Sequence, residues 1–160
     1  MQFIKNFQSL FVVAGLSLIL IACGGNNNSF ENDYSDAPAL ADTSNALSKV
    51  ITDSGVIYYV ISTGDSTSFE VTIRDNIFIY YTTRTLDGEI IASSYVNGST
   101  SAVSILNIGS QTRISFVGEG LAPGVLGMFE GERRVIFIPE DVSTIDEAIT
   151  IDVELELVDE

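Results

Sequence analysis

Few kinds of side chain in this sequence could carry out acid–base, nucleophilic or metal chemistry. The 160 residues include no histidine and a single cysteine, Cys23, beside 22 Asp and Glu residues. Without histidine, Ser/His/Asp and Cys/His catalysis and histidine-ligated metal sites are excluded. The carboxylates of Asp141, Asp146 and Glu147 lack the spacing of a metal-binding loop, which favours a solvated turn. We therefore expect no metal site and no cofactor.

Glycine and apolar residues alternate irregularly between residues 118 and 131. The glycines do not have the spacing of a dinucleotide-binding loop, and no lysine followed by Ser or Thr completes a phosphate-binding loop. The net charge of −15 also opposes an anionic ligand and excludes nucleic acid as a partner. The pattern instead predicts a short, irregular helical segment that needs a surface to pack on. Its apolar residues are Leu121, Val125, Leu126, Met128 and Phe129.

The N-terminal residues have the pattern of a secretory signal. Residues 1–22 combine an early lysine with an apolar run that is short for a membrane span. Residues 20–23, Leu-Ile-Ala-Cys, resemble the lipobox of bacterial lipoproteins. The resemblance implies cleavage before Cys23 and acylation of this cysteine, which would anchor the chain to a membrane. The alternative is a plain secretory signal with an incidental cysteine. Both alternatives predict a location outside the cytoplasm, and the lipid anchor predicts the cell envelope, on the periplasmic or surface side.

The remaining chain divides by composition at about residue 50. Residues 23–50 are rich in Asn, Asp, Ser and Gly, which predicts a flexible tether. Within it, residues 39–50 could instead form a short helix that docks on the domain. Residues 51–160 are rich in Val, Ile, Tyr, Phe and Thr, and they predict one domain.

Most of this domain has strand patterns. Apolar and polar residues alternate over residues 149–158, which predicts a half-buried strand with its acids facing water. Residues 76–86 and 89–96 flank Asp87-Gly88, which predicts a hairpin. Further candidate strands are 56–62, 69–73, 103–108, 113–117 and 133–138. An antiparallel sheet needs one face covered, and the short helical segment at residues 120–131 would cover it.

Three motifs in order resemble the FKBP-type peptidyl-prolyl cis-trans isomerases, or rotamases. They are YTTRTLDGEIIASS (81–94), GLAPGVLGMFEGERRVIFIP (120–139) and IDVELELV (151–158). The matching residues are Tyr81, Thr82, Leu86, Asp87, Gly88, Ser93, Ser94, Gly120, Gly124, Met128, Gly131, Glu132, Arg134, Ile138, Pro139, Val153, Glu154 and Leu155. The resemblance covers roughly residues 55–160. It implies an α+β fold, in which a curved antiparallel sheet wraps one short helix, and it implies proline-containing polypeptides as partners.

The resemblance also implies a substrate pocket formed by Tyr81, Ile91, Leu121 and Ile151. Tyr81 matches the family's pocket tyrosine, whereas the other three stand where the family has phenylalanine, tryptophan and phenylalanine. Ala92 replaces an aspartate, and the long flap after Pro139 is reduced to EDVSTIDEA. No catalytic residue is assigned, because rotation about an X-Pro bond breaks no bond and transfers no proton.

Two functions therefore remain open. The first is a membrane-anchored prolyl isomerase that assists the folding of exported proteins, with weak activity because most pocket aromatics and the flap are missing. The second is a non-catalytic FKBP-like module that binds polypeptides or acts as a chaperone.

Overall fold

The computed structural model describes residues 31–110 and 120–159. A compact unit begins at Asn32. The signal sequence, Cys23 and the candidate strand 113–117 lie outside the described residues.

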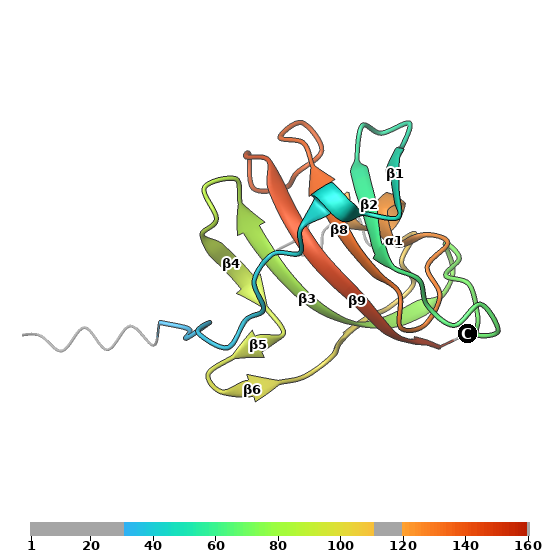
Figure 1. Ribbon diagram of the computed structural model, residues 1–160, viewed down its shortest axis with the longest axis horizontal. Helices are drawn as coiled ribbons and strands as arrows, with labels where there is room; N and C mark the ends of the chain where they lie inside the picture. The colour runs from blue at the N-terminus through green and yellow to red at the C-terminus, as the bar shows by residue number, and fades with distance from the viewer. Residues whose placement is uncertain (1–30, 111–119, 160) are drawn as a thin grey trace, which may run out of the picture. The chain divides into compact units, whose positions relative to one another are not determined.

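The compact unit contains one seven-stranded sheet in which all neighbouring strands are antiparallel (Figure 1). The path of the sheet is β1 (Ser48–Ile51), β2 (Ile57–Ser62), β8 (Arg133–Ile138), β9 (Ile149–Asp159), β3 (Asn76–Thr85) and β4 (Ile90–Ser93). Strand β7 (Val103–Ile105) pairs with the start of β3, and β5 (Tyr95–Val96) and β6 (Ser99–Thr100) form a separate hairpin. The predicted α+β class with a curved antiparallel sheet is confirmed.

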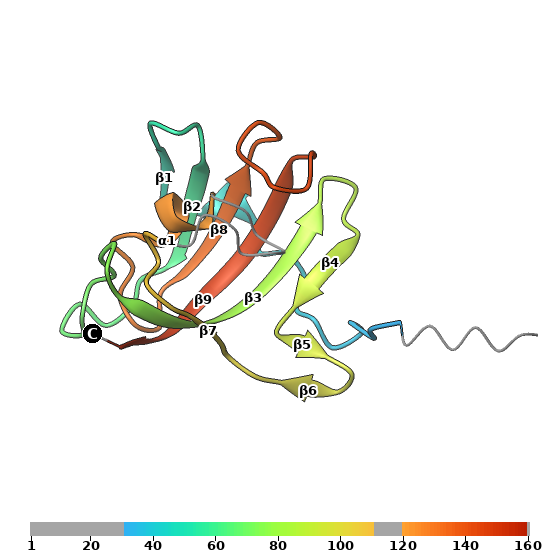
Figure 2. The same cartoon turned by 180° about the vertical axis from the view of Figure 1, so that it is seen from behind.

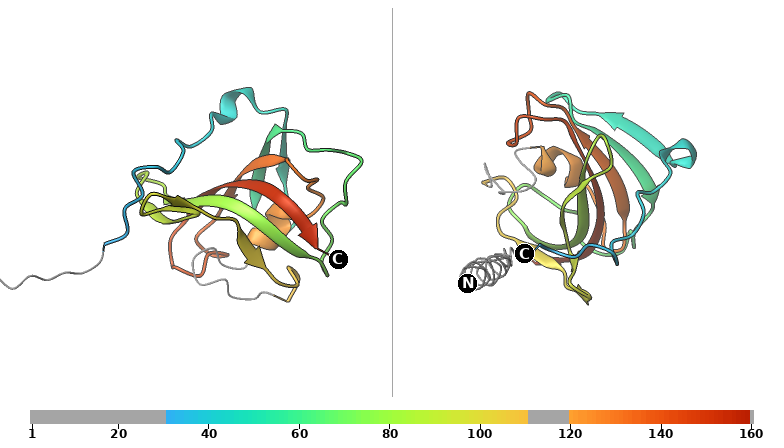
Figure 3. Two further views of the ribbon diagram at one scale, coloured as in Figure 1. Left: turned by 90° about the horizontal axis from the view of Figure 1, so that it is seen from below. Right: turned by 90° about the vertical axis from the view of Figure 1, so that its left-hand side faces the viewer.

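The helix α1 (Leu121–Val125) lies on one face of this sheet, which curves around it (Figures 2 and 3). We call this the concave face and the opposite one the outer face. The helix is shorter than the predicted segment, because Leu126 already leaves the helical conformation and Gly127 has a φ of 74°. Side chains from α1 and Met128 are fully buried against the sheet.

Close packing explains why glycine occupies positions 120 and 124. A Cβ atom on Gly124 would lie 2.6 Å from the side chain of Ile136, and one on Gly120 would lie 2.5 Å from that of Ile138. Both isoleucines belong to β8, so the helix backbone rests directly on that strand. Glycine at these two positions therefore allows the close contact between the helix backbone and β8.

Strand β9 confirms the predicted alternation, with two exceptions. Ile149, Ile151, Val153 and Leu155 are buried, but Leu157 is 44% exposed because the pairing with β3 shifts by one residue between Phe78 and Ile79. Asp152, predicted to face water, is only 7% exposed, since other parts of the chain cover it.

Two predicted strands are corrected. Residues 69–73 form a loop in which Phe69 and Ile73 are exposed, while Val71 N–H donates to Met128 O. The candidate 103–108 is strand only over β7, because Asn107 has a φ of 47° and turns the chain.

The described residues before β2 differ from the predicted tether. Residues 33–47, here called the strap, begin beside the β5–β6 hairpin and then run along the outer face of the sheet (Figures 1 and 3). The strap contains a 3₁₀ turn, η1 (Thr43–Asn45), in place of the helix considered for residues 39–50, and it leads into β1. Composition predicted a tether because residues 23–50 are rich in Asn, Asp, Ser and Gly, but the backbone of the strap is held by polar groups of the domain.

Candidate functional site

The structure places the four predicted pocket residues on the concave side of the unit. Tyr81 is on β3, Ile151 on β9 and Leu121 at the first position of α1, and all three belong to one core cluster. Ile91, on β4, is half-buried and packs against the same cluster. Tyr81 is 5% exposed, and Leu121 and Ile151 are fully buried. The accessible part of this group is therefore at Ile91.

Two serines fix the backbone of Tyr81. Ser94 Oγ accepts a hydrogen bond from Tyr81 N at 2.9 Å, and Ser94 N donates to Tyr81 O at 2.9 Å. The hydroxyl of Ser93 also donates to Tyr81 O, at 3.2 Å. These bonds tie β3 to the chain where it leaves β4, so the Ser-Ser pair positions the tyrosine.

The phenol of Tyr81 is in a poorly solvated environment. Burial, with a smaller electrostatic contribution from Tyr34, raises its pKa to about 12. A phenol with the ordinary pKa of 10.0 is already neutral at physiological pH, so the shift moves its ionisation further into the alkaline range. In the neutral form the phenol can donate a hydrogen bond but cannot act as a base.

A row of cross-strand neighbours lies beside Tyr81. Thr83 on β3 pairs with Ala92 on β4 and with Ile151 on β9. Thr83 is fully buried, and its Oγ1 has no hydrogen-bond partner among the described residues. A buried hydroxyl without a partner is unfavourable, and such groups are often found at functional sites.

Arg134 holds α1 against the sheet. Its Nη1 donates to Gly124 O at 3.0 Å and to Leu126 O at 2.9 Å, which satisfies carbonyl groups at the C-terminal end of the helix. Its Nε lies 2.6 Å from Glu132 Oε1, and its guanidinium stacks 4.3 Å above the Tyr58 ring. Arg134 and Glu132 are 4% and 5% exposed. Both residues of the Gly-Glu-x-Arg motif thus have structural roles.

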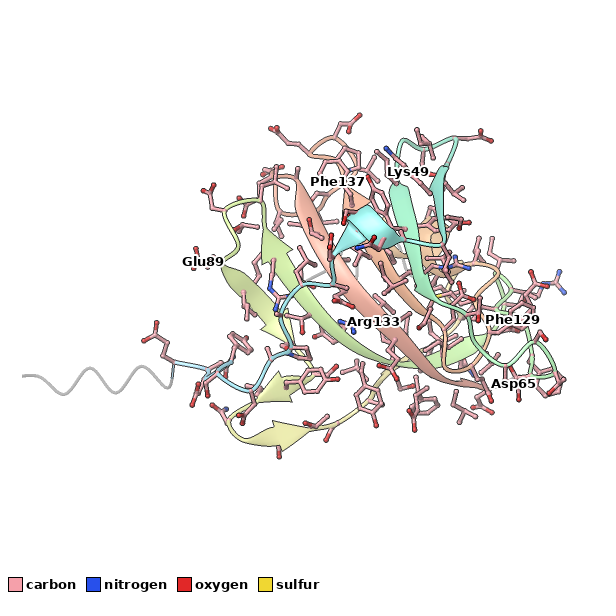
Figure 4. The ribbon with its side chains drawn as sticks, viewed as in Figure 1. Lys49, Asp65, Glu89, Phe129, Arg133 and Phe137 are labelled. Carbon is pink, nitrogen blue, oxygen red and sulfur yellow. The ribbon has the colours of Figure 1, made fainter. Side chains whose placement is uncertain are left out.

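The outer face carries a second, polar cluster under the strap. Arg133 binds Asp152 through two hydrogen bonds of 2.7 Å, and Arg133 lies on this face (Figure 4). Ala41 N of the strap donates to the same carboxylate at 3.1 Å, while Arg84 Nη2 donates to Pro38 O. A cavity of about 50 Å³ remains between the strap and the sheet. Its lining is Pro38, Tyr80, Tyr81, Thr82, Tyr95, Arg133, Asp152 and Glu154.

Sequence reasoning missed three residues near the site. Arg134 was recognised only as part of a motif, although an arginine shortly after a glycine-rich helical segment could have indicated helix capping. Nothing in the sequence indicated a role for Thr83, except that it follows Tyr81 and Thr82 at a position where the FKBP family has glycine. Tyr34 lies in the segment predicted to be a tether, so nothing connected it to the domain.

Within the described residues, no group of three or more Cys, Asp or Glu side chains is arranged to hold a metal ion. In the same part of the chain, no helix is long and apolar enough to cross a membrane.

A curved antiparallel sheet around one short helix, with a tyrosine at the concave base, defines an FKBP-like fold. No family model and no curated protein matches the sequence.

Solved structures share this fold at low sequence identity. FkpA from Escherichia coli matches with a TM-score of 0.57 and 18% identity over 72% of this chain and 53% of FkpA, so the match spans about half of that protein. A peptidyl-prolyl cis-trans isomerase from Pseudomonas syringae matches with a TM-score of 0.56 and 16% identity, over 74% of this chain and 86% of that one. The N-terminal domain of FKBP42 from Arabidopsis thaliana gives a TM-score of 0.58 and 18% identity, over 77% and 98%.

Proposed function

We propose that this chain is a peptidyl-prolyl cis-trans isomerase of the FKBP type that assists the folding of exported proteins. The observation that carries the proposal is Tyr81, held by Ser93 and Ser94 at the base of the concave face. The FKBP-like fold supports it, since the three solved structures include a peptidyl-prolyl isomerase.

The reaction suits a chain without histidine. Rotation about an X-Pro bond has a barrier of about 20 kcal/mol and takes tens to hundreds of seconds without a catalyst. The twisted amide loses resonance, so a poorly solvated apolar surface with a few hydrogen-bond donors lowers the barrier. No nucleophile or general base is required.

The purified full chain tests this proposal with a short peptide that contains one Leu-Pro bond. We expect the rate of cis-trans exchange to rise in proportion to protein concentration, and Leu121→Ala to lower it. Phe69→Ala, which changes an exposed aromatic side chain in a loop, is the control. An exchange rate equal to that in buffer at high protein concentration would exclude the enzyme.

A non-catalytic polypeptide-binding module is the second candidate. It is favoured by two properties of the base of the concave face. Leu121 and Ile151 are aliphatic instead of aromatic, and both are fully buried, so little surface is open there to hold a twisted amide. This function predicts that proline peptides bind without faster isomerisation. It is excluded if the wild-type chain accelerates exchange and Leu121→Ala abolishes the acceleration.

We further propose that Cys23 is acylated and anchors the chain in the cell envelope. The proposal is supported by residues 20–23 and the apolar run before them, which lie outside the described residues. Wild-type chain should sediment with membranes, and Cys23→Ala should shift it to the soluble fraction. Equal distribution of both chains would contradict the anchor.

A further inference from the structure

The start of the strap is clamped to the β5–β6 hairpin. Asp33 N donates to Asn97 Oδ1 at 2.9 Å, and Asn97 N donates to Asp33 O at 2.7 Å. Asn97 and Gly98 both have positive φ, as a tight two-residue turn requires, so the hairpin presents Asn97 at its tip. The carboxylate of Asp33 also accepts from Ser35 N at 2.9 Å. This reciprocal pair of hydrogen bonds joins Asp33 to Asn97, which lies 64 positions later in the sequence.

The clamp places Tyr34 at the edge of the four predicted pocket residues, Tyr81, Ile91, Leu121 and Ile151, here called the concave group. Its hydroxyl donates to Ile91 O at 3.3 Å and accepts from Asn32 Nδ2 at 3.2 Å. Tyr34 is half-buried, as is Ile91, the accessible member of the predicted pocket. Tyr34 is also near enough to Tyr81 to contribute to the raised pKa of that phenol.

The concave group has only one aromatic side chain among its four predicted members. Tyr81 is nearly inaccessible, and Leu121 and Ile151 are fully buried, so a bound peptide would meet mainly the surface around Ile91. An aliphatic side chain gives a weaker and less directional surface for a proline ring than the face of an aromatic ring does. The ring that the strap supplies at this point is that of Tyr34.

We propose that Tyr34 forms an aromatic wall of the peptide-binding site, next to Ile91, and contacts the proline ring of a bound polypeptide. The inference rests on the proposed function, in either its catalytic or its binding form. The ring comes from outside the residues that resemble the family.

The strap is well suited to present a binding residue. It is held before Tyr34 by Asn97 and after it by Arg84, which donates to Pro38 O, and by Asp152, which accepts from Ala41 N. A side chain whose backbone is fixed at both ends loses little conformational freedom when a ligand binds. Tyr34 is therefore preorganised although it lies in a segment without regular secondary structure.

Titration of the full chain with the single Leu-Pro peptide, followed by NMR, tests the inference. Tyr34→Leu keeps apolar bulk but removes the aromatic ring, and it should weaken binding about tenfold. Tyr34→Phe keeps the ring and should bind within about twofold of wild type, because a hydroxyl bonded at the solvent edge contributes little. Phe69→Ala is the matched control for loss of an exposed aromatic side chain, and should leave affinity unchanged.

Three outcomes decide the inference separately from the enzymatic proposal. If peptide binds without faster isomerisation, catalysis is excluded and the affinity of Tyr34→Leu still decides the role of the ring. If Tyr34→Leu binds as well as wild type, or more tightly, Tyr34 is not a wall of the site and the inference is wrong. If the wild-type chain binds no proline peptide, both proposals are wrong. The NMR spectrum of Tyr34→Leu must be that of a folded protein. Asn97→Ala removes the side-chain half of the clamp, the bond from Asp33 N to Asn97 Oδ1, and keeps the ring, so it should also weaken binding.

Discussion

The two faces of the sheet are formed by the same strands but satisfy their polar groups in different ways. On the outer face, Asp152 accepts two hydrogen bonds from Arg133 and one from the strap. On the concave face, the hydroxyl of Thr83 is buried without a partner among the described residues. On the outer face, Arg84 Nη1 also has no partner among them, although Nη2 of the same guanidinium donates to Pro38 O. Natural proteins pair nearly all buried polar groups, so an exception indicates either a ligand or a local cost in stability. Each face therefore has one such atom, but the Arg84 side chain is still bonded through Nη2, whereas the Thr83 hydroxyl has no bond among the described residues.

The largest expected effect is on stability, and it comes from Arg134, a polar side chain on the concave face that has a structural role. Arg134→Ala removes the guanidinium that caps α1 and leaves the buried carboxylate of Glu132 without its ion pair. We expect the free energy of unfolding to fall by about 3–5 kcal/mol, measured by urea denaturation. The exposed Arg74→Ala is the control, with an expected change under about 0.5 kcal/mol. A loss below about 1 kcal/mol for Arg134→Ala would contradict the capping role.

The outer-face network should have a smaller but clear effect. Asp152→Ala leaves Arg133 without its carboxylate and frees the strap at Ala41, and we expect a loss of about 1–3 kcal/mol. Hydrogen exchange at the Ala41 amide should accelerate in the same variant. Glu154→Ala, an exposed carboxylate two residues away on the same strand, should do neither. Unchanged exchange at Ala41 would show that Asp152 does not hold the strap.

Thr83→Val sharpens the comparison directly. The substitution replaces an unpartnered hydroxyl with a methyl group of similar size, so stability should be unchanged or rise by about 1 kcal/mol. Thr83→Ser, which keeps the hydroxyl, should not be stabilised. If Thr83→Val is destabilised by more than about 1 kcal/mol, the hydroxyl has a partner in solution and the contrast between the faces is weaker.

Substitution of Tyr81 should have the smallest effect on stability through its ionisation, because that ionisation changes nothing at neutral pH. The folded state raises the pKa of its phenol from 10.0 to about 12, so the folded state keeps the proton over a range where the unfolded chain loses it. Stability from this group is therefore complete below pH 10 and is lost as the pH rises from 10 to 12. Tyr81→Phe should flatten the decline in stability over this range. Phenolate absorbance of the wild type should show a late step that the variant lacks.

The sequence predicted the sheet class and most strands because alternation and turn residues act locally. Residues 149–158 and the Asp87-Gly88 turn are examples in which the pattern and the structure agree. Prediction failed where distant residues decide the outcome. Asp152 is buried because Arg133 and Ala41 reach it from β8 and from the strap, and no pattern within β9 records either partner.

The candidate site was predictable only in part, for the same reason. Motif order located Tyr81, Ile91, Leu121 and Ile151, and the structure gathers them around one cluster. It did not indicate that Leu121 and Ile151 are fully covered, which depends on the packing of α1 against β8 and β9. Tyr34 could not be predicted, since two hydrogen bonds between Asp33 and Asn97 place it, and both residues read as ordinary turn formers.

The position of β9 has a consequence for the order in which the chain folds. In the described sheet, β1, β2 and β8 lie on one side of β9, and β3, β4 and β7 lie on the other. These two halves are joined in the sheet by β9, which comes last in chain order among the described strands. During synthesis on the ribosome, the two halves must therefore wait for this strand, and contacts between residues far apart in sequence make its docking slow. A chain released before residue 149 would hold two unjoined half-sheets, each with an open hydrogen-bonding edge.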